Sequence, residues 1–225
     1  MTAMVRQAGD AIMAIYHAGD IASEAKADES PLTLADQASH VILDSALREL
    51  APSIPVISEE GDWVQSPARL SANRFWLVDP LDGTKEFIRR EKDFTVNVAL
   101  IVDGRPVWGM VYAPMRDWLY WGDEAGAFYQ AGQNAPESLP SPAAADRSPC
   151  VAVRSKSHAS PQEDAVLAAF GAEETVAMGS SLKLCLVAQG VADVYYRQGP
   201  TWEWDTAAGH AVVAAASGEV FCGTS

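Results

Sequence analysis

Cysteine is scarce in this sequence. The chain of 225 residues has three, Cys150, Cys185 and Cys222, which are far apart, and none stands in a C-x-x-C pair. A disulfide framework or a structural zinc site needs paired or closely spaced cysteines. The sequence therefore disfavours both, and we expect reduced thiols, as in a cytoplasmic protein.

Basic residues and long apolar runs are also in short supply. Lysine and arginine number 16 against 30 acidic residues, a formal net charge of −14, which argues against general binding to a nucleic-acid backbone. No stretch approaches the roughly 18 to 20 apolar residues that a membrane span needs. The N-terminus has no basic region followed by an apolar run, so we expect no secretory signal. These absences predict a cytoplasmic protein without a membrane span, and peripheral association with the inner membrane is compatible with them.

Apolar residues make up 48% of the chain, enough for a large buried core. Helical spacing predicts helices over Val5–His17 and Leu34–Leu50, with Thr33 and Asp36 placed as a capping box at the start of the second. Short apolar runs then predict a mostly antiparallel meander, with a hairpin turn at residues 103–105. Its strands are expected at Ile54–Ile57, Arg74–Val78, Phe94–Val102, Pro106–Tyr112, Trp118–Trp121 and Ala127–Tyr129.

A stretch rich in alanine, proline and serine, from Gln133 to Ser148, divides the chain. Beyond it we expect strands at Val151–Arg154, Val191–Arg197 and Val220–Cys222, and helices at Pro161–Phe170, Ser181–Gln189 and Thr206–Ala216. The pattern predicts an α+β fold in a single domain over residues 1–225. An N-terminal lobe would end at about residue 132, and a C-terminal lobe would begin at about residue 149.

Acidic residues stand where the predicted strands end. Glu59 and Glu60 follow one strand, Asp79 and Asp82 follow the next, and Asp205 directly precedes a predicted helix. Carboxylates that converge at one edge of a sheet repel each other and raise their own pKa values. A hard divalent cation removes this penalty, and oxygen ligands suit Mg²⁺.

The segment Asp79 to Thr84 suits such a site in detail. Pro80 fixes the chain direction, and Gly83 permits a tight turn. The carbonyl of Leu81 can add a third oxygen beside the two carboxylates, and the hydroxyl of Thr84 can orient a water.

Each of these acids also has an ordinary interpretation when it is taken alone. The Asp79 to Gly83 segment can be a solvated turn, and Glu59-Glu60 can be part of an exposed loop. Asp205 can be a helix N-cap, and Asp36 can be an acid of the capping box. Only their combination points to a metal site.

Three segments, in the same order along the chain, resemble signatures of the inositol monophosphatase superfamily. Asp79–Thr84 resembles D-P-x-D-G-T, Trp204–Gly209 resembles W-D-x-A-A-G, and Ser58–Glu60 resembles the upstream acidic loop. The resemblance covers nearly the whole chain. It implies a layered α/β/α/β sugar-phosphatase fold and a Mg²⁺-dependent phosphomonoesterase. Chains of this family usually continue well beyond a strand such as the one expected near Val220, whereas this sequence ends at Ser225.

Shorter segments are similar to one branch, the CysQ group of 3′(2′),5′-bisphosphate nucleotidases. They are Lys26–Thr33, Lys85–Ile88, Ser155–His158, Gly179–Lys183 and Gly199–Thr201. This resemblance implies hydrolysis of adenosine 3′,5′-bisphosphate to AMP and phosphate, which clears a by-product of sulfate assimilation, and sensitivity to lithium. The partner it implies is a small phosphate ester and no nucleic-acid polymer.

The resemblance also implies roles for individual residues. Glu59, Asp79, Asp82, Asp205 and the carbonyl of Leu81 would be ligands of two or three Mg²⁺ ions per active site. The N-terminal lobe would then be the metal-binding lobe, and the C-terminal lobe would bind the substrate.

The attacking water would be positioned by Asp36 and Thr84, with Glu60 close by, for direct in-line hydrolysis. Substrate contacts would come from Gly83, Thr84, His158, Ser180, Lys183, Arg197 and Asp205. The N-termini of the helices expected near Thr206 and Ser180 would favour its phosphate.

Alternatives remain at this stage. An inositol-1-phosphatase or a fructose-1,6-bisphosphatase would have the same catalytic acids, and a regulatory binding protein could retain the fold without turnover. The aromatic residues Trp108, Trp118, Tyr120 and Trp121 are compatible with a homodimer interface or with ordinary packing of strands.

Overall fold

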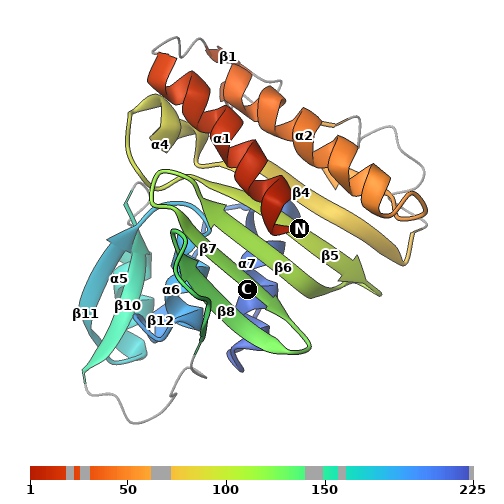
Figure 1. The fold of residues 1–225 in the computed structure, drawn as a ribbon. Coiled ribbons are helices and arrows are strands. Elements are labelled where there is room, and N and C mark those ends of the chain that lie inside the picture. Colours follow the sequence, from red (N-terminus) through yellow and green to blue (C-terminus); the bar gives the residue numbers. More distant parts are fainter. Residues whose placement is uncertain (19–22, 26–30, 62–71, 140–148, 157–160, 223–225) are drawn as a thin grey trace.

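A seven-stranded mixed sheet forms the centre of the computed structural model, which describes residues 1–18, 23–25, 31–61, 72–139, 149–156 and 161–222 (Figure 1). In sheet order its strands are β3 (Val56–Ser58), β4 (Arg74–Asp82), β5 (Thr95–Val102), β6 (Arg105–Ala113), β7 (Trp118–Asp123), β8 (Gly126–Ala131) and β9 (Glu137–Ser138). β3 runs parallel to β4, and the other neighbouring pairs are antiparallel. The predicted meander is thus the core of the sheet.

Two long helices, α1 (Thr2–Ala18) and α2 (Leu34–Leu50), cover one face of this sheet (Figure 1). A short hairpin of β1 (Ser23–Ala25) and β2 (Pro31–Thr33) lies between them in the chain. The apolar stripes of both helices pack against side chains of β4, β5 and β6 and form one hydrophobic core. Both predicted helices are confirmed, and α2 has the predicted bounds.

The other face of the large sheet is covered by α7 (Glu203–Ala215), with α6 (Leu182–Ala188) beside it. A three-stranded parallel sheet follows, with the order β11 (Ala172–Met178), β10 (Cys150–Ser155) and β12 (Val194–Tyr195). α5 (Pro161–Ala169) packs against β11. Side chains from both sheets, α6 and α7 form a second core. The layered α/β/α/β arrangement confirms the predicted fold class.

α7 approaches the large sheet unusually closely. A Cβ atom on Gly109 of β6 would lie 2.4 Å from the carbonyl oxygen of Ala208, and one on Gly122 of β7 would lie 2.8 Å from that of Ala211. Glycine at these positions lets the helix backbone lie directly on the strands. α7 follows the dividing stretch in sequence but packs on the large sheet, and the two-lobe division remains a prediction.

Some predicted elements differ from the structure. Val220–Cys222 forms no strand; these residues are exposed and pair with no strand of the described chain. The strand predicted over Val191–Arg197 is only Val194–Tyr195, and α7 begins at Glu203 rather than at Thr206. β11, α4 (Thr84–Ile88) and β9 were not predicted. In β11 the exposed, polar Glu173 and Glu174 hide the apolar pattern of a strand.

The four aromatic residues named as a possible interface pack within the chain. Tyr120 is fully buried. The rings of Trp108 and Trp121 contact Trp76 and Phe128, respectively. The homodimer remains a prediction. In the part of the chain that the structure describes, no helix has both the length and the apolar character to cross a membrane.

Candidate metal centre

The segment Asp79 to Thr84 ends the buried strand β4 and turns into α4. Asp79 is only 1% exposed, and its Oδ1 accepts a hydrogen bond from the backbone N–H of Leu81 at 3.0 Å. Gly83 has a φ of +91°, in the left-handed region that glycine adopts at no steric cost. The tight turn predicted at this position is therefore present, and it directs both carboxylates to one side.

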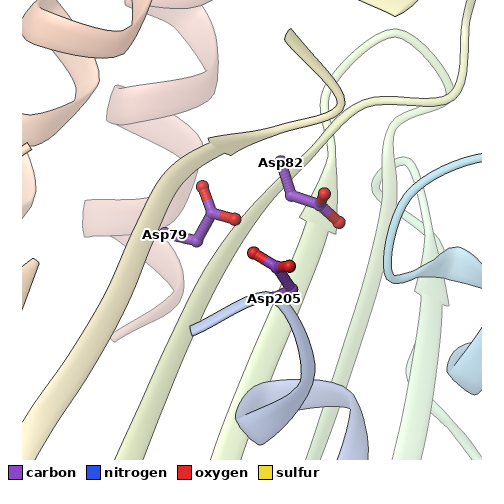
Figure 2. Close-up of side chains that lie close together, drawn as sticks. All are labelled: Asp79, Asp82 and Asp205. Atoms are coloured by element: carbon purple, nitrogen blue, oxygen red, sulfur yellow. The ribbon is translucent and has the colours of Figure 1, made fainter. Parts of the chain in front are cut away.

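Three aspartates converge at this turn. One carboxylate oxygen each of Asp79, Asp82 and Asp205 lies within 4.8 Å of the other two. Figure 2 shows the three side chains pointing toward one another, two from the end of β4 and one from the first turn of α7. Residues more than a hundred positions apart in the sequence are thus brought to one place.

The electrostatics of this cluster are unfavourable without a counter-charge. Burial raises the pKa of Asp79 well above its usual value, and the neighbouring charges of Glu59, Asp82 and Asp205 raise it further. Burial and the charge of Asp205 likewise raise the pKa of Asp82. Burial also raises the pKa of Asp205, although two hydrogen bonds oppose that shift. These shifts follow the rule that like charges and low dielectric disfavour ionisation.

Glu59 reaches the cluster from the strand beside β4. Its backbone N–H donates to the carbonyl of Val78 at 3.0 Å, which continues the parallel pairing of β3 with β4. Its side chain is hydrogen-bonded to Asp79, and this bond contributes to the raised pKa of Asp79. Glu60 follows in the same turn and is half-buried. The preceding Ser58 is buried, and its hydroxyl lies 2.8 Å from Nδ1 of His40 on α2.

Asp36 lies at the start of α2 and is 1% exposed. Its Oδ2 accepts hydrogen bonds from the backbone N–H of Thr33 at 2.8 Å and from the hydroxyl of Thr33 at 2.5 Å. The first of these belongs to the predicted capping box, in which the hydroxyl oxygen of Thr33 in turn accepts a backbone N–H, that of Ala35 at 3.1 Å. The Oδ1 of Asp36 accepts a hydrogen bond from the hydroxyl of Thr84 at 3.3 Å. The two oxygens therefore combine the capping role with a contact to the site. The same hydroxyl lies 3.2 Å from the carbonyl oxygen of Leu81.

Residues of the second part of the chain meet the cluster at Asp82. Its Oδ2 accepts hydrogen bonds from the hydroxyl of Ser180 at 2.5 Å and from the backbone N–H of Ser181 at 2.6 Å. Lys183 is 4% exposed, and its ammonium group donates to the carbonyl of Ser180 at 2.5 Å. Burial lowers the pKa of Lys183, while the charge of Asp82 opposes that shift. Ser180 and Lys183 are thus placed beside the predicted metal ligands.

The other two predicted substrate contacts from the second part of the chain are Arg197 and His158. Arg197 is exposed and donates to the carbonyl of Pro200 at 3.0 Å. Its charge acts on Asp205 and on Lys183, so it lies on the same side of the molecule as the cluster. His158 lies outside the described residues.

Three residues of this region were not predicted from the sequence. Asp93, Thr95 and Asn97 are buried beside the turn that carries Ser180 and Ser181. The signal that could have identified them is their alternation: polar residues recur at every second position, just before and at the start of an otherwise apolar strand. Such a pattern on a buried strand indicates a buried polar contact.

The donor set fits a hard divalent cation. The cluster offers carboxylate oxygens, which are the ligands that Mg²⁺ and Ca²⁺ prefer, and no sulfur or imidazole atom belongs to it among the described residues. A bound cation would also relieve the repulsion that raises the three pKa values. The described part of the chain can therefore bind a metal at this position.

Comparison with known proteins finds relatives that are similar to this chain over almost its whole length. Residues 1–224 match the model of the inositol monophosphatase family. The 3′(2′),5′-bisphosphate nucleotidase CysQ of Escherichia coli K12 is 46% identical over 227 residues, covering 96% of this chain and 87% of that protein. The 3′(2′),5′-bisphosphate nucleotidase CysQ of Buchnera aphidicola is 40% identical, and the match covers 96% of this chain and 81% of that protein.

Solved structures have the same fold. The crystal structure of CysQ from Bacteroides thetaiotaomicron is 40% identical, with a TM-score of 0.79 over 95% of this chain and 83% of that one. An inositol monophosphatase from Thermotoga maritima has a TM-score of 0.74 at 23% identity, over 95% and 80%. At that identity the likeness concerns the fold alone.

Proposed function

The chain belongs to the inositol monophosphatase family, and from this premise we propose that it is a metal-dependent phosphomonoesterase that acts on 3′(2′),5′-bisphosphate nucleotides. The observation that carries the phosphatase assignment is the convergence of Asp79, Asp82 and Asp205 within 4.8 Å, with Glu59 hydrogen-bonded to the first of them. The preference for a nucleotide substrate is supported by the similarity to the CysQ proteins over 96% of the chain.

Mg²⁺ is the proposed cation, with two or three ions per site. Its ligands would be the carboxylates of Glu59, Asp79, Asp82 and Asp205 and the carbonyl of Leu81. When bound, such cations stabilise charge on a phosphoryl group and lower the pKa of water. The chain's own contribution is to hold these oxygens in place through the bonds described above.

The proposed water-positioning pair is Asp36 and Thr84. Because the hydroxyl of Thr84 donates to Oδ1 of Asp36, the lone pairs of its oxygen are left to accept a hydrogen bond from a water. The buried carboxylate thereby sets the direction of the hydroxyl. Glu60, in the turn after β3, would lie close to the same water.

Lys183, Ser180 and Arg197 are the proposed contacts for the nucleotide's phosphates, together with Gly83 and His158. Lys183 and Arg197 bring positive charge next to the acidic cluster. This local charge allows an acidic protein to bind an anionic substrate. The proposed reaction releases phosphate from adenosine 3′,5′-bisphosphate (PAP) and leaves AMP. It would thereby recycle the PAP that forms during sulfate assimilation. A cytoplasmic location and a homodimer are part of the same proposal.

The test compares kcat/KM for adenosine 3′,5′-bisphosphate, inositol 1-phosphate and fructose 1,6-bisphosphate at saturating MgCl₂. We expect the bisphosphate nucleotide to exceed the other two by about tenfold or more. The Asp82→Asn variant should lose phosphate release with all three while its circular dichroism stays that of the wild type.

Other outcomes would overturn the proposal. A higher kcat/KM for inositol 1-phosphate or fructose 1,6-bisphosphate would assign the chain to those activities. Absence of phosphate release from every ester, at any MgCl₂ concentration, would favour a regulatory protein that retains the fold.

A further inference from the structure

A row of buried polar side chains, one just before β5 and two on it, contacts the turn Gly179–Ser181. Thr95 and Asn97 alternate along β5 and therefore point to the same face of the strand. Asp93 lies two residues before β5 and contacts the same turn through Gly179. The exposed fractions of Asp93, Thr95 and Asn97 are 0%, 0% and 1%. We call these three residues the β5 polar ladder.

The ladder lies in the sheet directly beside the metal centre. In the antiparallel pairing of β4 with β5, Thr95 is opposite Asp82 and Asn97 is opposite Asp79. Residues opposite each other in such a pair have neighbouring side chains on one face. The ladder is therefore one strand away from the two aspartates of β4.

Each residue of the turn contacts at least one residue of the ladder. The N–H of Gly179 donates to Oδ2 of Asp93 at 3.2 Å. The hydroxyl oxygens of Ser180 and Thr95 lie 2.6 Å apart and are hydrogen-bonded. The hydroxyl of Ser181 donates to Oδ1 of Asn97 at 2.8 Å. Thr95 also lies 2.8 Å from the hydroxyl of Ser181. The turn is thus fixed along its whole length.

Asp93 is a charged anchor for this contact. Burial alone would raise its pKa, but the side chains of Lys156 and Arg116 are hydrogen-bonded to it and hold the pKa below its usual value. Arg116 donates to its Oδ1 at 2.5 Å and Lys156 is ion-paired with its Oδ2, which also accepts the N–H of Gly179. The carboxylate therefore joins three separate segments of the chain.

The turn is built for close contact with the ladder. A Cβ atom on Gly179 would lie 2.7 Å from the Cβ of Asp93, a distance that real Cβ contacts do not show. Ser180 has a φ of +54°, in a region that residues with a side chain rarely adopt. A strained conformation persists where its surroundings fix it, and here the ladder supplies the surroundings.

The turn is also hydrogen-bonded to the metal centre, so its position affects that of a proposed metal ligand. Ser180 and Ser181 both donate to Oδ2 of Asp82, and Lys183 donates to the carbonyl of Ser180. We propose that the β5 polar ladder is a set of positioning residues, which hold the turn so that Asp82 and Lys183 face the metal and the substrate. This inference rests on the proposed function, because it concerns the same site.

The test replaces Thr95, the central residue of the ladder. Thr95→Val removes the hydroxyl at nearly constant volume, whereas Thr95→Ser retains it. Val96→Ala is the matched control, because Val96 is equally buried but belongs to the core on the opposite face of β5. For each variant two quantities are measured: the MgCl₂ concentration for half-maximal phosphate release, and the rise in Tm on adding MgCl₂.

We expect Thr95→Val to raise the half-maximal MgCl₂ concentration by about 10-fold, the lower end of the effect of losing a direct partner of a metal ligand, because Thr95 acts on Asp82 through Ser180 and Ser181. The rise in Tm at a fixed MgCl₂ concentration should shrink with it. Thr95→Ser should restore both values toward those of the wild type. Val96→Ala should lower Tm without metal but leave the half-maximal concentration within about twofold.

Equal changes in the MgCl₂ dependence of Thr95→Val and Val96→Ala would overturn the inference. If Thr95→Val does not fold, Gly179→Ala tests the same contact from the side of the turn, with the same expected outcome. If the wild type releases no phosphate, the proposed function fails, and the Tm measurements still decide whether the ladder controls binding of the metal.

Discussion

Asp36 and Asp205 occupy equivalent positions at the starts of two helices on opposite faces of the large sheet. Each lies in the first turn, and its Oδ2 accepts the backbone N–H of the residue three positions earlier: that of Thr33 at 2.8 Å and that of Trp202 at 3.0 Å. Each Oδ2 also accepts a threonine hydroxyl, from Thr33 at 2.5 Å and from Thr201 at 2.7 Å. The local device is nearly the same.

The surroundings of the two acids differ. Asp36 is buried between α2 and the turn after β4, where its Oδ1 accepts a hydrogen bond from the hydroxyl of Thr84. Asp205 instead faces two further carboxylates (Figure 2). The same capping geometry thus fixes an acid that orients a hydroxyl in one place and an acid that suits a cation in the other. The neighbours, and not the local backbone, set the chemistry.

The largest expected difference between the two acids appears when each is changed to asparagine. Asp205→Asn should raise the MgCl₂ concentration for half-maximal activity by at least about tenfold, because a proposed ligand loses its charge. Asp36→Asn should leave that concentration nearly unchanged but lower kcat by about 10²-fold or more, because proton acceptance from the water is impaired. Steady-state kinetics over a MgCl₂ series measure both values.

Stability should change in the opposite sense. Without metal, Asp205→Asn should keep or raise Tm, because repulsion within the cluster is relieved. Asp36→Asn should lower the free energy of unfolding by about 1–2 kcal/mol, because a buried hydrogen-bonded carboxylate is lost. Equal effects of the two substitutions on MgCl₂ dependence would show that the two acids do not differ as proposed.

A smaller effect is expected from pH on the metal-free protein. The pKa values of Asp79, Asp82 and Asp205 are raised in the folded state, so the folded protein binds more protons than the unfolded chain. Their contribution to stability is therefore greatest below the ordinary carboxylate pKa and is lost as pH rises through the raised values.

Magnesium should oppose this loss, so the rise in Tm caused by MgCl₂ should grow with increasing pH. Thermal unfolding from about pH 5 to pH 8, with MgCl₂ or with EDTA, measures it. The Asp82→Asn variant is the control and should show a weaker dependence. A rise in Tm that is the same at every pH would contradict the electrostatic account of the cluster.

The smallest expected effect concerns the two capping threonines. Thr33 is buried, so Thr33→Ala should cost about 1 kcal/mol of stability. Thr201 is exposed, so water can replace its hydroxyl, and Thr201→Ala should cost about 0.5 kcal/mol or less. Urea unfolding without metal compares the two. A larger cost at Thr201 would mean that the start of α7 depends more on its cap than its exposure suggests.

Local signals were sufficient for much of the fold. The bounds of α2 and its capping box follow from Thr33 and Asp36. The hairpin between β5 and β6 was predicted at residues 103–105, and its turn consists of Asp103 and Gly104, whose φ values of 49° and 74° are those of a two-residue hairpin turn. At the start of α7 the local signal is weaker, because the N-cap residue is Trp202, whose side chain accepts no hydrogen bond.

The site was accessible to sequence reasoning only in part. The acids of β4 stand in one short motif, and the structure brings Asp205 to them. The β5 polar ladder could not be assigned a role from sequence, because its partners in the turn Gly179–Ser181 lie more than eighty positions away. The role of a buried threonine in a strand can be inferred only when the group that it contacts is known.

The close approach of α7 to Gly109 and Gly122 has a consequence for the order in which the molecule is made. More than half of the chain's length separates Asp82 from Asp205, so a growing polypeptide carries the β4 acids long before α7 leaves the ribosome. Only when the small residues of α7 settle on those glycines does the third acid reach the other two. We therefore expect the proposed metal centre to be completed late in biosynthesis, so that binding of a cation there would report that the molecule has finished folding.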